Sequence, residues 1–90
     1  MNLENLDGIE QLVNLKYLSF SRNQLTSLEG IGNIRDLKVL LCSNNQLTSL
    51  REIENLKDLK LLWCYNNNFS NDYKEYLRDY CKEKNIKLNI

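Results

Sequence analysis

Three cysteines carry the most reactive side chains of this 90-residue sequence. Cys42 and Cys64 lie 22 residues apart, and no pair of the three has the Cys-x-x-Cys spacing of redox or zinc sites. Cys81 is close to Lys82 and Lys84, whose positive charges can lower the pKa of a thiol. Because the chain contains no histidine, His-dependent catalytic triads and Cys₂His₂ zinc sites are excluded. We therefore expect no metal and no cofactor.

The carboxylates and glycines do not form a catalytic pattern either. The three glycines, Gly8, Gly30 and Gly32, fall in crossover segments and make no loop that could hold a phosphate. The acidic residues lie mostly in surface positions at repeat spacing. An active site needs a convergent acid, base or nucleophile, so we expect that the protein is not an enzyme.

Composition narrows the classes of partner. Twelve basic and 12 acidic residues cancel, whereas nucleic-acid-binding proteins usually carry a basic stripe, so a nucleic-acid partner is not favoured. No apolar run approaches the roughly 20 residues of a membrane span, and the first 11 residues contain acids but no Lys or Arg. We expect a cytoplasmic protein with no membrane partner, located in the cytoplasm of a host cell if it is delivered as an effector or phage product.

The elements that position all these residues follow a 22-residue repeat. Three segments align without gaps: LKYLSFSRNQL at 15–25, LKVLLCSNNQL at 37–47 and LKLLWCYNNNF at 59–69. Alternating residues in each segment predict a short strand, and the Leu and Ile residues that follow at three-residue spacing predict 3₁₀-like turns. Cys42 and Cys64 occupy the inward position of Phe20. We read them as small buried hydrophobic residues, although thiols on neighbouring strands could also approach each other.

One asparagine recurs where each strand must turn: Asn23, Asn45 and Asn67. A short amide at such a turn can bond the loop backbone of the next coil. We predict a structural asparagine ladder with no role in ligand binding.

This pattern resembles the leucine-rich repeat family over residues 3–69. It is most similar to the 22-residue class found in regulators of the type-one protein phosphatase and in bacterial internalins. The resemblance implies an α/β fold: a short right-handed solenoid with a parallel sheet on its concave face and 3₁₀-like turns on its convex face. It also implies that ligands, usually proteins, bind the sheet.

The two ends depart from the repeat, although residues 1–90 are expected to form one domain. Residues 1–14 read as a partial first repeat with no strand before it, which would leave a strand at Tyr17–Ser21 as an open edge unless Met1–Asn14 folds over it. Residues 70–90 read as a C-terminal cap: a helix starting near Asp72 and ending at Asn85, then a strand. In that strand we expect inward residues that continue the positions of Leu62 and Cys64, and outward residues on the concave side; the inward pair is Ile86 and Leu88, and the outward pair is Lys87 and Asn89.

On the cap helix, three tyrosines share one face at helical spacing. They are Tyr73, Tyr76 and Tyr80. We expect this face to pack against the repeats.

The outward strand positions are the candidate binding site. Three columns face the concave side: Tyr17, Val39 and Leu61; Ser19, Leu41 and Trp63; Ser21, Ser43 and Tyr65. We expect the apolar members to form one surface, with Trp63 as its anchor and Arg22, Lys38 and Lys60 at its rim. Asp36 and Asp58 can offset the charge of the column formed by Lys16, Lys38 and Lys60, as can an acidic partner.

Such a surface needs a partner, and three remain open: a different protein, a second copy of the chain, or the chain's own ends. A second copy could dock on the apolar face or on the open N-terminal edge. We expect a binding module that inhibits or blocks another macromolecule. The alternatives are a homo-oligomerising scaffold or adaptor, or a fragment of a longer repeat array. The Asn- and Lys-rich, proline-free composition favours a bacterial or phage source.

Overall fold

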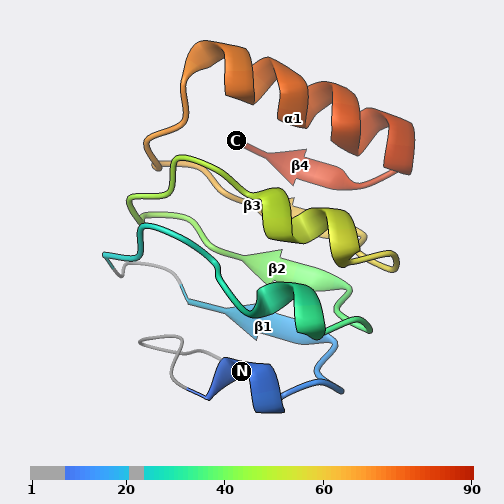
Figure 1. Cartoon of the computed structure of the whole chain (residues 1–90). Helices are drawn as coiled ribbons and strands as arrows, with labels where there is room; N and C mark the ends of the chain where they lie inside the picture. The colour runs from blue at the N-terminus through green and yellow to red at the C-terminus, as the bar shows by residue number, and fades with distance from the viewer. Residues whose placement is uncertain (1–7, 21–23) are drawn as a thin grey trace.

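In the part of the chain that the structure describes, four short parallel strands form one sheet (Figure 1). The structure, a computed structural model, describes residues 8–20 and 24–90. The strands are β1 (Tyr17–Ser19), β2 (Val39–Leu41), β3 (Leu61–Trp63) and β4 (Lys87–Asn89), and their order in the sheet follows their order in the chain. The sequence therefore places each strand beside the next one, as a repeat of one unit requires.

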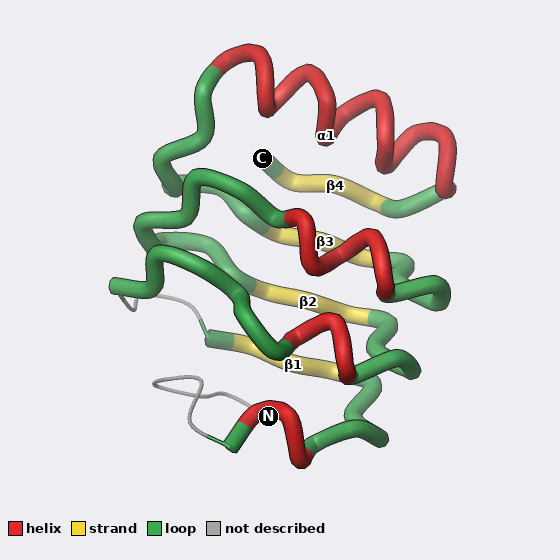
Figure 2. Tube along the Cα trace, viewed as in Figure 1, coloured by secondary structure: helices red, strands yellow, loops and turns green. Residues whose placement is uncertain are grey.

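Three 3₁₀ helices form a second layer that faces the sheet (Figure 2). They are η1 (Ile9–Gln11), η2 (Ile31–Asn33) and η3 (Arg51–Asn55), and each packs on the next. Gly30 starts η2 with a φ of 94°, a conformation that favours glycine. A Cβ added to Gly30 would lie 2.9 Å from Cγ2 of Ile9. The first two turns can therefore stack this closely because position 30 lacks a side chain.

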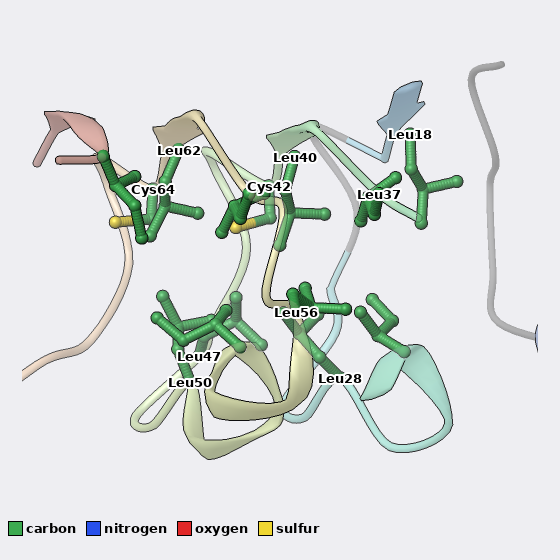
Figure 3. Close-up of a cluster of buried hydrophobic side chains, with 14 of the residues drawn as sticks. Leu18, Leu28, Leu37, Leu40, Cys42, Leu47, Leu50, Leu56, Leu62 and Cys64 are labelled. Atoms are coloured by element: carbon green, nitrogen blue, oxygen red, sulfur yellow. The ribbon is translucent and has the colours of Figure 1, made fainter. Parts of the chain in front are cut away.

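The core fills the space between the sheet and the 3₁₀ layer (Figure 3). Leu18, Leu40 and Leu62 point inward from the strands and are fully buried. Leu28 and Leu50 meet them from the opposite layer and are also fully buried. Each such leucine stabilises the fold by about 1.5–3 kcal/mol, so the repeated leucines are the main source of stability.

The C-terminal end of the stack is formed by helix α1 (Asn71–Lys84) and β4. Ser70 caps the helix by accepting a hydrogen bond from the backbone N–H of Tyr73 at 3.1 Å. Asn85 ends it in the left-handed conformation, with φ 59°. Leu77 and Cys81 are the helix residues buried against the core. The α/β solenoid predicted from the repeat is confirmed, including its C-terminal helix and strand.

The predicted register of the last strand is wrong by two residues. Leu88 pairs with Leu62, so it takes the position that we had predicted for Ile86. The cause is the position of the helix end: Asn85 turns the chain, Ile86 packs at the turn, and pairing begins at Lys87. Lys87 and Asn89 are exposed on the outer side of the sheet, as predicted, but they lie beside Leu61 and Trp63 and not beside Trp63 and Tyr65, as the predicted register implies.

Within the described residues, β1 pairs only with β2. Lys16 and Phe20 bond to the second coil, and alternate residues of a parallel strand direct their backbone groups to opposite sides. The N–H and C=O groups of Tyr17 and Ser19 therefore point away from β2. Residues 8–14 do not cover this edge, because they continue the 3₁₀ layer; residues 1–7 of the predicted cover lie outside the described part.

The part of the chain that the structure describes holds no helix with the length and apolar character of a membrane span.

Candidate functional site

The outer sheet face, which is the face opposite the 3₁₀ layer, is built from alternate residues of each strand. Strand pairing aligns one row of Tyr17, Val39, Leu61 and Lys87 and a second row of Ser19, Leu41, Trp63 and Asn89. The residue between the two rows is a buried leucine in each of the first three strands. The predicted first and second columns therefore lie side by side.

The aromatic members of these rows are open to solvent. Tyr17 is 47% exposed and Trp63 is 39% exposed. Val39, Leu41 and Leu61 are half-buried because neighbouring rows shield their flanks. The rings of Trp63 and Tyr65 are 6.3 Å apart and tilted by 47°, so Tyr65 extends the apolar surface beyond the end of β3.

Polar residues end this surface at the last strand. Lys87 and Asn89 of β4 follow Leu61 and Trp63 in the two rows. The apolar patch is therefore confined to the first three strands, where it consists of the six residues Tyr17, Val39, Leu41, Leu61, Trp63 and Tyr65.

The prediction that Ser43 faces solvent is wrong. Ser43 is only 2% exposed, and its hydroxyl has no hydrogen-bond partner among the described residues. The cause is the backbone of Asn44, which turns the chain out of the sheet with a φ of 62°. Ser21, the other serine of this column, lies outside the described residues, as does the rim residue Arg22.

The asparagine ladder is present at the two described positions. The amide nitrogen of Asn45 donates to the carbonyls of Phe20 at 2.9 Å and Cys42 at 3.0 Å, and its oxygen accepts from the N–H of Leu25 at 3.3 Å. Asn67 repeats these bonds one coil later, accepting from the N–H of Leu47 at 3.0 Å. The amide thus reaches the preceding coil, not the next one as predicted, because the loop before it lies within reach of its side chain. The third predicted member, Asn23, lies outside the described residues.

A second, exposed asparagine contact was not predicted. Asn66 donates from its side chain to the side-chain oxygen of Asn44 at 2.9 Å. Both residues have positive φ angles, 56° and 62°, and asparagine tolerates this conformation better than most residues. The paired Asn-Asn steps at 44–45 and 66–67 were the signal in the sequence.

The predicted lysine column is exposed along one margin of the patch. Lys16, Lys38 and Lys60 immediately precede β1, β2 and β3. Each of the first two accepts two backbone hydrogen bonds at its carbonyl; that of Lys16 receives them from Lys38 at 2.8 Å and Val39 at 3.0 Å. The backbone of this column is therefore held at the spacing of the strands.

The cysteines are buried free thiols. Burial raises the pKa of Cys42, and the neighbouring Cys64 raises it further. Burial and then Cys81 raise the pKa of Cys64 to about 12, and burial raises that of Cys81 to about 11. The expected lowering of the Cys81 pKa by its lysine neighbours is wrong, because the thiol lies in the core while the lysines are exposed.

The tyrosine face of α1 packs against the repeats, as predicted, but only in part. The hydroxyl of Tyr73 accepts a hydrogen bond of 2.7 Å from the N–H of Leu50. Tyr76 donates to Glu54 at 2.9 Å and stays 44% exposed. This bond to the carboxylate is the main reason why the pKa of Tyr76 is raised to about 12.

The groups on the outer sheet face are suited to contact with another molecule. Among residues 8–20 and 24–90, no group of three Cys, Asp or Glu side chains is placed to hold a metal ion. The outer sheet face carries aromatic, aliphatic, amide and ammonium groups. Such groups can bind a surface of another molecule.

Comparisons with a protein-family description and with a solved structure both find leucine-rich repeats in this chain. Residues 35–76 match the family described as leucine rich repeats, in two copies. A solved leucine-rich repeat protein of Leptospira interrogans is similar over 91% of this chain, with 39% sequence identity and a TM-score of 0.79. The chain spans 21% of the length of that protein. Comparison with curated proteins gives no significant match.

The leucine-rich repeat fold is typically a protein-interaction module, and proteins of this family are generally binding modules instead of enzymes. Two features carry the assignment: the 22-residue register of the strands and the asparagine bonds between successive coils. The chain is a leucine-rich repeat protein.

Proposed function

We propose that this protein binds another protein through its outer sheet face. The supporting observation is the pair of exposed rings, Tyr17 and Trp63, which share the two outer rows with the aliphatic side chains of Val39, Leu41 and Leu61. Aromatic side chains surrounded by aliphatic ones are typical of the centre of an interface. Tyr65 extends the site, and Lys38 and Lys60 form its rim.

We further propose that binding inhibits the partner by covering its surface. Every described helix and strand belongs to the sheet, the 3₁₀ layer or the C-terminal helix and strand. We therefore expect these residues to act on the partner through binding. We assign it no catalytic role and no cofactor, and we place it in the cytoplasm.

A second copy of the chain is the competing partner. The backbone groups of Tyr17 and Ser19 that point away from β2 could pair with another strand. Light scattering at about micromolar concentration, where an interface of standard size is populated, separates the two cases. A dimer that dissociates on Leu41→Asp substitution would mean that a second copy, and not a different protein, occupies the outer sheet face. A dimer that persists in this variant would point to pairing at the β1 edge.

The direct test uses crosslinking in the source cells with the intact protein and with a Leu41→Asp/Trp63→Asp variant. Both substituted side chains are on the outer sheet face, so the variant should keep the fold, which circular dichroism can verify. We expect a partner that crosslinks to the intact protein only and whose affinity falls by about 2–4 kcal/mol on Trp63→Ala. Equal binding of that partner to the double variant would disprove the proposal.

A further inference from the structure

The chain has no net charge, but the fold places many of its basic residues on one side of the molecule. Three segments lead into β1, β2 and β3, at 13–16, 34–38 and 56–60, and a fourth, at 84–87, runs from the last residue of α1 to the first residue of β4. Together they contain seven of the 12 basic residues but only two of the 12 acidic ones, Asp36 and Asp58. Stacking of the coils brings these segments to one side of the molecule, on the right in Figure 1. We call this side the basic edge; its cations are Lys16, Arg35, Lys38, Lys57, Lys60, Lys84 and Lys87.

The inner row of this edge borders the apolar patch. Each lysine of this row directly precedes one patch residue in the chain: Lys16 before Tyr17, Lys38 before Val39 and Lys60 before Leu61. All three lysines are exposed. Neighbouring strands are about 4.8 Å apart, so the row carries cations at that spacing. Lys87 adds a positive charge at the β4 end of the patch.

The outer row lines three adjoining hollows. One, of about 480 Å³, is lined by Val13, Asn14, Asn33, Arg35 and Asp36. It shares Arg35 with the next, of about 300 Å³, which in turn shares Lys57 with a third of about 340 Å³. This third hollow is also lined by Lys84 and by one carboxylate, that of Glu54, which accepts the hydrogen bond of Tyr76. The edge is therefore furrowed between coils, with a cation at each step.

The opposite margin of the patch has a different character. Among the described residues of that margin, the exposed contact joins the side-chain amides of Asn44 and Asn66, which carry no charge. A molecule lying across β2 and β3 thus meets positive charge on one side and neutral amides on the other.

From this asymmetry we infer that the partner presents an acidic protein segment, with apolar side chains on Leu41, Leu61 and Trp63 and carboxylates directed to the basic edge. The inference rests on the proposed binding at the outer sheet face and adds the chemistry of the partner. Carboxylates of such a segment would reach Lys16, Lys38 and Lys60 at repeat spacing. The repeat predicts the lysine column of this edge, whereas the further cations, Arg35, Lys57, Lys84 and Lys87, come beside it only when the coils stack.

A protein segment fits better than a nucleic acid. The aliphatic side chains of Val39, Leu41 and Leu61 lie between the two exposed rings, and they offer no stacking surface to bases. Asp36 and Asp58 on the basic edge repel an unbroken row of phosphates. A peptide can place its acids opposite the lysines and leave the positions near these aspartates neutral.

Peptide selection tests the inference with the full-length chain. A random library of about 12-residue peptides is suitable, because an extended peptide of that length reaches roughly 40 Å and the molecule is 32 Å long. Peptides enriched on the immobilised protein are then titrated against it at about 50 mM and about 500 mM salt, where charge screening differs strongly.

Three variants locate the binding. Leu41→Asp disrupts the apolar patch. The edge variant Lys16→Gln/Lys38→Gln/Lys60→Gln removes three charges beside it, and the control Arg51→Gln/Arg78→Gln/Lys82→Gln removes three exposed charges elsewhere. We expect enriched peptides with more acidic than basic residues, an affinity loss of about tenfold for the edge variant at low salt, and a smaller loss at high salt. The control should change affinity less than about twofold.

The other outcomes contradict either the acidic nature of the partner or the binding at the outer sheet face. If the peptides have no acidic excess, depend on Leu41 and ignore the edge variant, the acidic partner is wrong while binding at the outer sheet face stands. If no peptide is enriched, or enriched peptides bind the Leu41→Asp variant normally, both proposals are wrong. If an oligo-dT strand binds more tightly than the peptides, and the edge variant no longer binds it, the partner is a nucleic acid and not an acidic protein segment.

Discussion

The side chain of Asn45 donates a 2.9 Å hydrogen bond to the backbone carbonyl of Phe20, 25 residues earlier in the chain. Asn45 is only 7% exposed, so the groups that it satisfies have no ready access to water. We expect Asn45→Ala to lower the free energy of unfolding by about 2–3 kcal/mol, since buried backbone groups lose their partners. Urea unfolding followed by circular dichroism measures this change.

The exposed contact between Asn66 and Asn44 provides the control. Asn66→Gly removes the side-chain bond but tolerates the φ of 56°. We expect it to cost less than about 1 kcal/mol, because water can replace an exposed partner. Equal losses for the two variants would show that burial of the Asn45 bonds adds nothing.

Gly30→Ala tests the close stacking of the first two 3₁₀ turns. The added methyl group would lie 2.9 Å from Cγ2 of Ile9, and φ at this position is 94°. Gly8→Ala is the matched variant, since Gly8 also has a positive φ, 75°, but no atom lies within 4 Å of its added Cβ. We expect the loss at Gly30 to exceed the loss at Gly8 by about 1 kcal/mol or more. Thermal unfolding of both variants gives the comparison, and a larger loss at Gly8 would contradict it.

Tyr73→Phe tests how α1 is attached to the repeats. The substitution keeps the ring, which lies 5.5 Å from that of Phe69, but removes the acceptor of the Leu50 N–H bond. We predict a loss of about 1–2 kcal/mol and faster hydrogen exchange at the Leu50 amide. Tyr76→Phe, which removes an exposed bond to Glu54, should cost less than about 0.5 kcal/mol. Unchanged exchange at Leu50 would show that Tyr73 does not protect this amide.

The buried thiols predict a loss of stability in alkali. The pKa of Cys64 is raised from its ordinary value of 9.0 to about 12 in the folded protein. Because the folded pKa is raised, the unfolded chain releases the thiol proton at a lower pH than the folded protein does. The contribution of this thiol to the free energy of unfolding is therefore complete below about pH 9 and is lost as the pH rises toward 12. Urea titrations at several pH values should show this decline, and it should be smaller in Cys64→Ala than in Lys60→Gln, an exposed change that leaves the thiol in place. An identical decline in both variants would exclude the thiol as a cause.

The repeat alone was sufficient to predict the inward and outward sides of the first three strands. Each position of the 22-residue repeat has a counterpart 22 residues later, on the neighbouring coil. Because equivalent residues lie side by side, the strands pair in parallel and in register, as Leu18, Leu40 and Leu62 do. The amide positions Asn45 and Asn67 were predictable for the same reason. Their direction toward the preceding coil was not, because it depends on how the loop is folded in space.

The errors occur where the chain leaves the repeat or turns. The register of β4 depends on where α1 ends at Asn85, which no repeat position determines. Ser43 is buried because of the backbone turn at Asn44, and the pKa of Cys81 follows its burial instead of its neighbours in sequence. The lysine column was predicted from the repeat, but its extension into a basic edge was missed, because total charge carries no information on how charges are arranged in space.

The bonds of Asn45 and Asn67 also determine which part of the protein should open last. Asn45 ties the second coil to the first, and Asn67 ties the third coil to the second. Each coil touches mainly its neighbours, so opening can begin at either end and proceed inward. The strands of the second and third coils are both paired on two sides, and among the described residues the second coil is the one joined by asparagine side-chain bonds to both of its neighbours. Its amides, those of Leu40 and Leu41 included, should exchange with solvent only when the whole stack comes apart.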